Sequence, residues 1–232
     1  MPTEFAPGLV TQGCTPPLKL RDYQVIAFDM DSTLINIECI DEIADAAGKK
    51  AEVSAITEAA MRGEIADFKE SLRRRVALLR GVPASALQQV YAQRLQLNPG
   101  AESLVQAAMA AGLKTLLVSG GFTYFAERVQ ARLGMHEAHS NVLEIDAEGR
   151  LTGQVLGDIV DGDAKRRHLL SLCERVGCPP CAAIAVGDGA NDLPMMGAAG
   201  LSVAYHAKPK VREQAMVSIQ AGGLDRLLEI LR

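Results

Sequence analysis

The chain has 232 residues, 48% of them hydrophobic, which is enough for one core and a small second module. Its net charge of −4 and its 4% of aromatic residues argue against the basic clusters and stacking surfaces of nucleic-acid-binding proteins. The sequence has 5 Cys but no disulfide pattern, signal peptide or membrane span, so we expect a cytoplasmic protein with free thiols and no membrane partner.

The N-terminal segment is rich in Pro and Gly and shows little periodicity, so we expect a loosely ordered leader over residues 1–21. A short apolar run, Val25–Phe28, follows this segment and ends in Asp29. Its length and its flanking residues are typical of a buried parallel strand.

Residues 39–97 have a different pattern, in which apolar residues recur at helical spacing and no strand signal interrupts them. One apolar stripe of this block consists of Phe68, Leu72, Val76 and Leu79. The break at residues 98–100, which read Asn-Pro-Gly, ends the block.

Strands and helices alternate in the rest of the chain. We expect helices over 101–111, 123–133, 163–176, 191–198 and 223–231, strands over 114–118, 182–186, 201–204 and 216–219, and a hairpin of 141–147 with 151–155. This order predicts an α/β fold with a parallel sheet and helices on both of its faces. The core comprises 22–38 and 98–232, and the helical block 39–97 is inserted over the sheet.

Four polar clusters stand at the ends of predicted strands or beside them, where such sheets bind ligands. They are Asp29-Met30-Asp31-Ser32-Thr33, Ser119-Gly120-Gly121, Lys165, and Gly187-Asp188-Gly189-Ala190-Asn191-Asp192. Carboxylates brought together in this way repel one another unless a cation lies between them, and oxygen ligands favour Mg²⁺. Ser119, the glycine N–H groups and Lys165 suit the oxygens of a phosphoryl group.

These clusters predict phosphoryl chemistry with a carboxylate nucleophile, since the chain lacks a GxxxxGK[ST] phosphate-binding loop. Asp29 attacks phosphorus. Asp31 protonates the leaving oxygen and then takes a proton from the water that cleaves the aspartyl phosphate.

The four clusters, in this order and spacing, resemble the motifs of the haloacid dehalogenase (HAD) superfamily. The strings FDMDSTLINIECIDEIAD, ESLRRRVALLRG, VSGGF and VGDGANDLPMM are similar to the phosphoserine phosphatase family from about residue 22 to the C-terminus. The resemblance implies a Rossmann-like core with a C1-type helical-bundle cap, and an Mg²⁺-dependent hydrolase that forms L-serine in the last step of its biosynthesis.

The resemblance also implies roles for particular residues, carried over by position. Asp29 is the nucleophile and Asp31 the acid and base, while Asp29, the Asp31 carbonyl and Asp188 hold Mg²⁺ with support from Asp192. The expected substrate-binding residues are Ser119, Gly120, Lys165 and Asn191 for the phosphoryl group, Glu38 for the ammonium, Arg75 for the carboxylate, and Met61 and Phe68 for the apolar cover of the pocket.

Two other functions fit parts of this pattern. A related HAD enzyme could act on another small phosphate or pass the phosphoryl group to homoserine. A phosphoryl-accepting receiver domain also uses a strand-end Asp, Mg²⁺ and Lys, although Asp31 and the inserted helical block argue against it. We expect a monomer or a homodimer.

Overall fold

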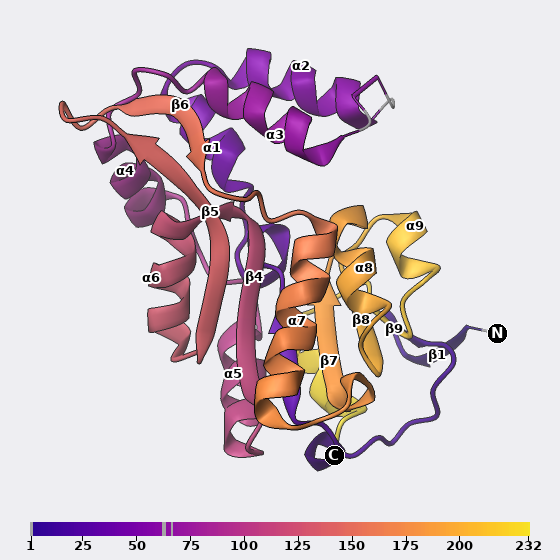
Figure 1. Cartoon of the computed structure of the whole chain (residues 1–232). Coiled ribbons are helices and arrows are strands. Elements are labelled where there is room, and N and C mark those ends of the chain that lie inside the picture. The colour runs from indigo at the N-terminus through magenta and orange to yellow at the C-terminus, as the bar shows by residue number, and fades with distance from the viewer. Residues whose placement is uncertain (1, 62–63, 66) are drawn as a thin grey trace.

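The structure is a computed structural model, and it describes residues 2–61, 64–65 and 67–232. Its centre is a nine-stranded sheet in the order β1-β2-β9-β8-β7-β3-β4-β5-β6, which is parallel from β9 to β5 (Figure 1). The strands are β1 Thr3–Ala6, β2 Leu9–Thr11, β3 Val25–Phe28, β4 Lys114–Phe122, β5 Glu137–Ile145, β6 Leu151–Leu156, β7 Ala183–Gly187, β8 Leu201–Tyr205 and β9 Val217–Ile219.

Helices cover both faces of this sheet, as the alternation of elements predicts. Successive residues of a strand point to opposite faces. Ile26 and Phe28 therefore pack with α5 and α6, and Val25 and Ala27 pack with α7 and α8. These helices and the short α9 are α5 Ala101–Ala110, α6 Thr123–Leu133, α7 Gly162–Val176, α8 Leu193–Met196 and α9 Pro209–Arg212.

The described part of 39–97 forms four helices that lie over the carboxyl ends of the parallel strands (Figure 1). They are α1 Cys39–Ala46, α2 Lys50–Met61, α3 Phe68–Ala77 and α4 Ser85–Gln93. The hairpin of β5 and β6 reaches this cap, where the N–H groups of Gly81 and Ala84 donate to the carbonyls of Leu151 and Gly149.

The prediction of a loosely ordered leader over 1–21 is wrong. Strands β1 and β2 form a hairpin, and β2 pairs with β9 at the edge of the sheet. The side chain of Leu9 is fully buried there. Hairpin pairing and the burial of Leu9 and Thr11 order a segment whose composition is that of a loop.

Three other predicted elements differ from the structure. The strand predicted to end at Val118 continues to Phe122, and β5 begins at Glu137, so that its first half pairs with β4. The C-terminal helix is a 3₁₀ helix over Leu224–Glu229. Its buried residues Leu224 and Leu227, and Ile230 beyond it, are three apart, which matches the period of a 3₁₀ helix.

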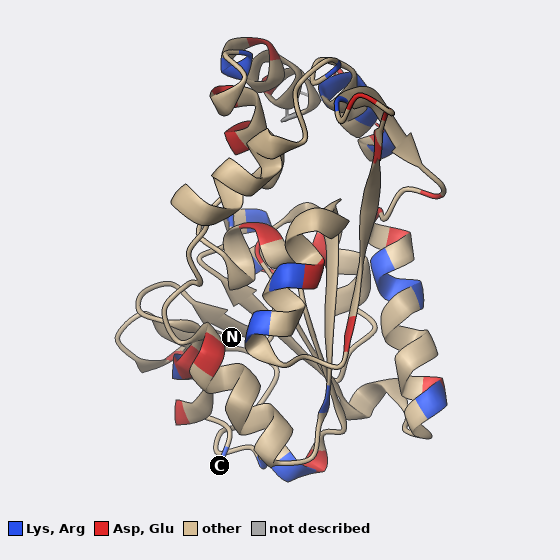
Figure 2. Ribbon diagram, turned by 90° about the vertical axis from the view of Figure 1, so that its left-hand side faces the viewer, with Lys and Arg blue, Asp and Glu red and all other residues tan. Residues whose placement is uncertain are grey.

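Lysines and arginines lie interspersed with aspartates and glutamates over the core and the cap (Figure 2). None of the helices in the described parts of the chain is both long and apolar enough to cross a lipid bilayer.

Candidate active site

The site is built at the carboxyl ends of β3 and β7 and on the adjoining residues of β4. Strand β3 lies between β4 and β7, with Phe28 opposite Leu117 and Val186. Because the three strands are parallel and in register, Asp29, Ser119 and Asp188 follow within two residues at the same edge. The structure therefore brings together three of the clusters that the sequence singles out.

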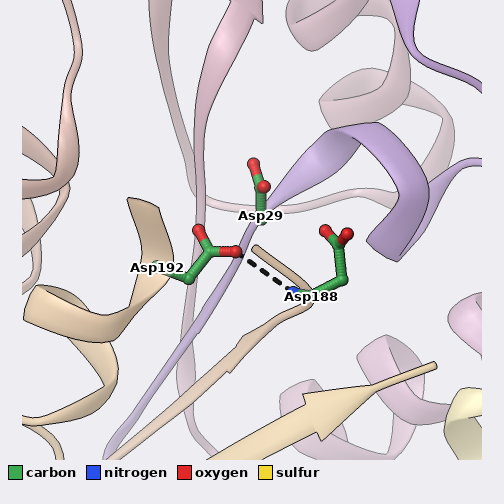
Figure 3. Close-up of side chains that lie close together, drawn as sticks. All are labelled: Asp29, Asp188 and Asp192. Atoms are coloured by element: carbon green, nitrogen blue, oxygen red, sulfur yellow. Dashed lines mark hydrogen bonds between the residues drawn. The ribbon is translucent and has the colours of Figure 1, made fainter. Parts of the chain in front are cut away.

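Asp29, Asp188 and Asp192 form a compact group of carboxylates (Figure 3). One oxygen from each lies within 4.8 Å of the others. Lys165, on α7, is fully buried and places its Nζ 2.7 Å from Asp29 Oδ1 and 2.6 Å from Asp192 Oδ1. Three acids thus share one buried cation, which leaves a net negative charge at the strand ends.

The pKa values of these groups reflect that imbalance. Burial raises the pKa of Asp29, the charge of Asp192 raises it further, and Lys165 opposes the rise. Burial followed by the charge of Asp192 raises the pKa of Asp188 to about 7. Burial alone lowers the pKa of Lys165, but Asp192 and Asp29 outweigh it and raise that pKa above its ordinary value. A further cation at this site would relieve the repulsion among the acids.

Asp192 does more than contribute charge. Its Oδ2 accepts hydrogen bonds from the N–H groups of Asp188 and Gly189, at 3.1 and 2.9 Å. Its Oδ1 accepts from Lys165. Asn191 lies beside it in the same 3₁₀ turn, with its Oδ1 over Gly189. Asp192 therefore fixes both the Asp188 loop and the ammonium of Lys165.

The turn after β3 carries Asp31 and Ser32. It spans Met30–Leu34, where the Ile35 N–H donates to the Met30 carbonyl, and it is not a regular helix, because Ser32 adopts the left-handed conformation with φ 56°. Such strained residues concentrate at functional sites. Here the conformation lets Ser32 Oγ donate to Glu38 Oε1 at 2.6 Å.

Asp31 is buried in this turn. Burial and then the charge of Glu38 raise its pKa to about 7. Cys39 holds the carboxyl: its N–H lies 3.1 Å from Oδ2 and its Sγ lies 3.2 Å from Oδ1. Asp31 can therefore exist in either protonation state near neutral pH.

On the β4 side, Ser119 is buried and its Oγ accepts from the N–H of Gly121 at 2.9 Å. A Cβ on the neighbouring Gly120 would lie 3.0 Å from Cζ of the Phe68 ring, so a side chain there would require that ring to shift. The Gly120 carbonyl accepts from Asn141 Nδ2 at 2.8 Å. This segment is therefore held by its neighbours on both sides.

Glu38, the last residue of the core segment before the cap, and Arg75 of the cap face the same region. Glu38 precedes α1 and remains open to solvent. Arg75, on α3, is half-buried. Burial lowers its pKa, and the charges of Asp41, Glu38 and Asp31 oppose this effect, so these acids are its electrostatic neighbours.

The other predicted cap residues have different outcomes. Phe68 on α3 packs over Gly120, as a covering residue would. The side chain of Met61 lies outside the described residues. Arg73 and Arg74 point to solvent, and Arg74 pairs with Glu70.

Three supporting residues have contacts that the sequence did not predict. Asn141 is fully buried and bridges the Gly120 carbonyl and the Val160 N–H. Thr33 Oγ1 donates to Asp188 at 3.2 Å. Asp161 caps α7 by accepting from the Ala164 N–H, and it pairs with Lys69 of the cap at 3.0 Å. Thr33 belongs to the polar cluster after the first strand, and Asp161 is an acid at the start of a helix, whereas Asn141 carries no such signal.

Comparisons with known proteins agree with this geometry. The family model for haloacid dehalogenase-like hydrolases matches residues 23–200. The chain is 66% identical over 235 residues to a phosphoserine phosphatase of Polaromonas sp., covering 100% of this chain and 99% of that protein. Two solved structures, a substrate-bound phosphoserine phosphatase complex and a phospho-aspartyl intermediate analogue of phosphoserine phosphatase, each match with a TM-score of 0.84 and 37% identity, over 90% of this chain and 99% of theirs.

Proposed function

We propose an activity for this chain from the family to which it belongs, the phosphoserine phosphatases within the haloacid dehalogenase-like hydrolases. The chain hydrolyses O-phospho-L-serine to L-serine and phosphate, the last step of serine biosynthesis. The observation that carries the proposal is the buried contact of Lys165 with Asp29 and Asp192 at the strand ends, beneath a cap that bears Arg75.

Asp29 is the nucleophile in this proposal. Its Oδ1 accepts from Lys165 and from the Met30 N–H, each at 2.7 Å. These two bonds fix the carboxyl and engage Oδ1, so we assign attack on phosphorus to Oδ2. Attack forms the Asp29–phosphorus bond and breaks the bond from phosphorus to the serine oxygen.

Asp31 transfers the protons. It donates one to the departing serine oxygen, and it then accepts one from the water that attacks phosphorus in phospho-Asp29. A pKa of about 7 suits both tasks. An acid of ordinary pKa would be almost fully ionised at neutral pH and could not serve the first step.

The cluster of Asp29, Asp188 and Asp192 fits Mg²⁺. All of its possible metal ligands are oxygens, and its three acids outnumber the one buried cation. Burial and mutual repulsion also raise the pKa values of Asp29 and Asp188. Asp29, Asp188 and the Asp31 carbonyl are the residues that would hold the ion. Asp192, whose oxygens already accept three hydrogen bonds, supports Asp188 and Lys165. When bound, the ion neutralises charge that would otherwise repel the phosphoryl group.

The remaining residues select the substrate. Ser119, Gly120, Asn191 and Lys165 bind the phosphoryl group. Glu38, at the end of the core segment 22–38, meets the ammonium, and Arg75, from the cap, meets the carboxylate. Phe68 covers the pocket. Closure of the cap over these groups excludes water from the first step.

We place the protein in the cytoplasm, because its five cysteines are free, as in a reducing compartment. A monomer or a homodimer remains the expected assembly.

Phosphate release from two substrates tests the activity and its specificity. Phosphoserine should turn over only with Mg²⁺, and Asp29→Asn should abolish turnover. O-phosphoethanolamine lacks the carboxylate, so Arg75→Ala should lower kcat/KM about a hundredfold on phosphoserine and little on phosphoethanolamine. Arg74→Ala is the matched control. Equal loss on both substrates, or none, would refute the role of Arg75.

A further inference from the structure

The carboxyl of Asp31 is held at both oxygens by one residue, Cys39. The backbone N–H of Cys39 donates to Oδ2 at 3.1 Å, and its thiol donates to Oδ1 at 3.2 Å. Cys39 is fully buried, and Asp31 is 9% exposed. Cys39 is also the first residue of α1, so the contact joins the cap to the turn that carries Asp31.

The two contacts differ in chemistry. A backbone N–H can only donate, so it keeps Oδ2 an acceptor and favours Oδ1 as the oxygen that carries the transferable proton. A thiol can rotate and can donate or accept. Its contact with Oδ1 can therefore persist whether or not that oxygen is protonated.

We propose that Cys39 is a positioning residue for proton transfer, whose thiol keeps the Asp31 carboxyl in one orientation through both steps of the reaction. This inference rests on the proposed function. In the first step the Oδ1 proton moves to the serine oxygen as its bond to phosphorus breaks. In the second step a proton of the attacking water moves to Oδ1 as the phosphorus–Asp29 bond breaks.

A fully apolar or a permanently charged side chain at residue 39 would serve the reaction less well. Alanine leaves Oδ1 without its side-chain partner and lets the carboxyl turn about its Oδ2 contact. A cation would hold the ionised form alone. A hydroxyl, which also donates and accepts, should replace the thiol.

Two substrates separate positioning from general damage. p-Nitrophenolate leaves without protonation, whereas the serine oxygen requires a proton. In Cys39→Ala, kcat for phosphoserine should fall about tenfold to a hundredfold, with KM within about twofold. With p-nitrophenyl phosphate, rapid mixing should show a nitrophenolate burst at the wild-type rate followed by a slowed steady state, because the second step still needs Asp31.

Cys39→Ser should restore turnover of phosphoserine to within about threefold of wild type. Cys173→Ala, which removes a buried thiol from α7 away from the site, is the matched control and should leave turnover unchanged. Thermal unfolding of each variant shows that it is folded.

The inference is overturned if Cys39→Ala is as active as wild type, if it slows the nitrophenolate burst as much as phosphoserine turnover, or if Cys39→Ser is as impaired as Cys39→Ala. A wild type that releases no phosphate from phosphoserine refutes the proposed function instead.

Discussion

Replacing Lys165 by Met should destabilise the apoprotein strongly. The ammonium is fully buried and contacts Asp192 and Asp29 at 2.6 and 2.7 Å, so its removal leaves three acids in the interior without a cation. Removing one partner of a buried ion pair costs about 3–5 kcal/mol. For a chain of this length, that loss corresponds to a fall in Tm of roughly 6–20 °C.

Calorimetry in EDTA and in Mg²⁺ measures this effect. The loss should be smaller in Mg²⁺, because an ion among the carboxylates replaces part of the missing charge. Adding Asp192→Asn to Lys165→Met should recover some stability by removing one acid. Lys69→Met is the control, since its bond to Asp161 is partly exposed and worth about 0–1 kcal/mol. Equal losses for the two lysines, or a Lys165→Met loss that Mg²⁺ does not reduce, would refute the reasoning.

Three further predictions concern pH, the N-terminal hairpin and the cap. Burial raises the pKa of Asp188 to about 7, so the folded apoprotein binds this proton more tightly than the unfolded chain does, and stability falls as pH rises from about 4 to about 7. Urea unfolding in EDTA measures the free energy of unfolding at each pH. In Asp188→Asn this free energy should decrease less between about pH 4 and about pH 7, and the same decrease as in wild type would contradict the raised pKa of Asp188. Leu9→Ala should lower the free energy of unfolding by about 2–5 kcal/mol, because the Leu9 side chain is fully buried. Phe5 is exposed, so Phe5→Ala should change it by no more than about 0.5 kcal/mol. Similar losses for the two variants would show that the hairpin is not part of the core. Gly120→Ala should lower kcat/KM for phosphoserine roughly tenfold, because the added Cβ meets the Phe68 ring and hinders closure of the cap. Adding Phe68→Leu should then restore part of kcat/KM, and no recovery would contradict this cause.

The sequence predicts the parallel core, the helical block and the strand-end acids, because each follows from local pattern. Val25–Phe28 is a continuous apolar run, and polar residues follow it at once. The parallel pairing of β3 with β7 then brings Asp29 and Asp188 to the same edge of the sheet. Parallel order of the strands is therefore enough to predict that these two acids lie close together.

Features that depend on tertiary contact could not be predicted in this way. The strand at residues 9–11 exists because β9 offers an open edge, which no local propensity reveals. Asn141 lies in an ordinary hairpin strand, and only the fold places its amide against Gly120. A cysteine in a helix is typical of a buried core residue, so its type does not reveal a site. The contact of Cys39 with Asp31 depends on how α1 meets the preceding turn.

A covalent phosphoenzyme on Asp29 can be trapped chemically. The protein is quenched with borohydride during turnover of phosphoserine, and its peptides are mapped by mass spectrometry. Borohydride reduces an aspartyl phosphate to homoserine. We expect homoserine at residue 29, dependent on both phosphoserine and Mg²⁺, and absent in Asp29→Asn. Turnover without modification of residue 29, or reduction at another acid, would contradict it.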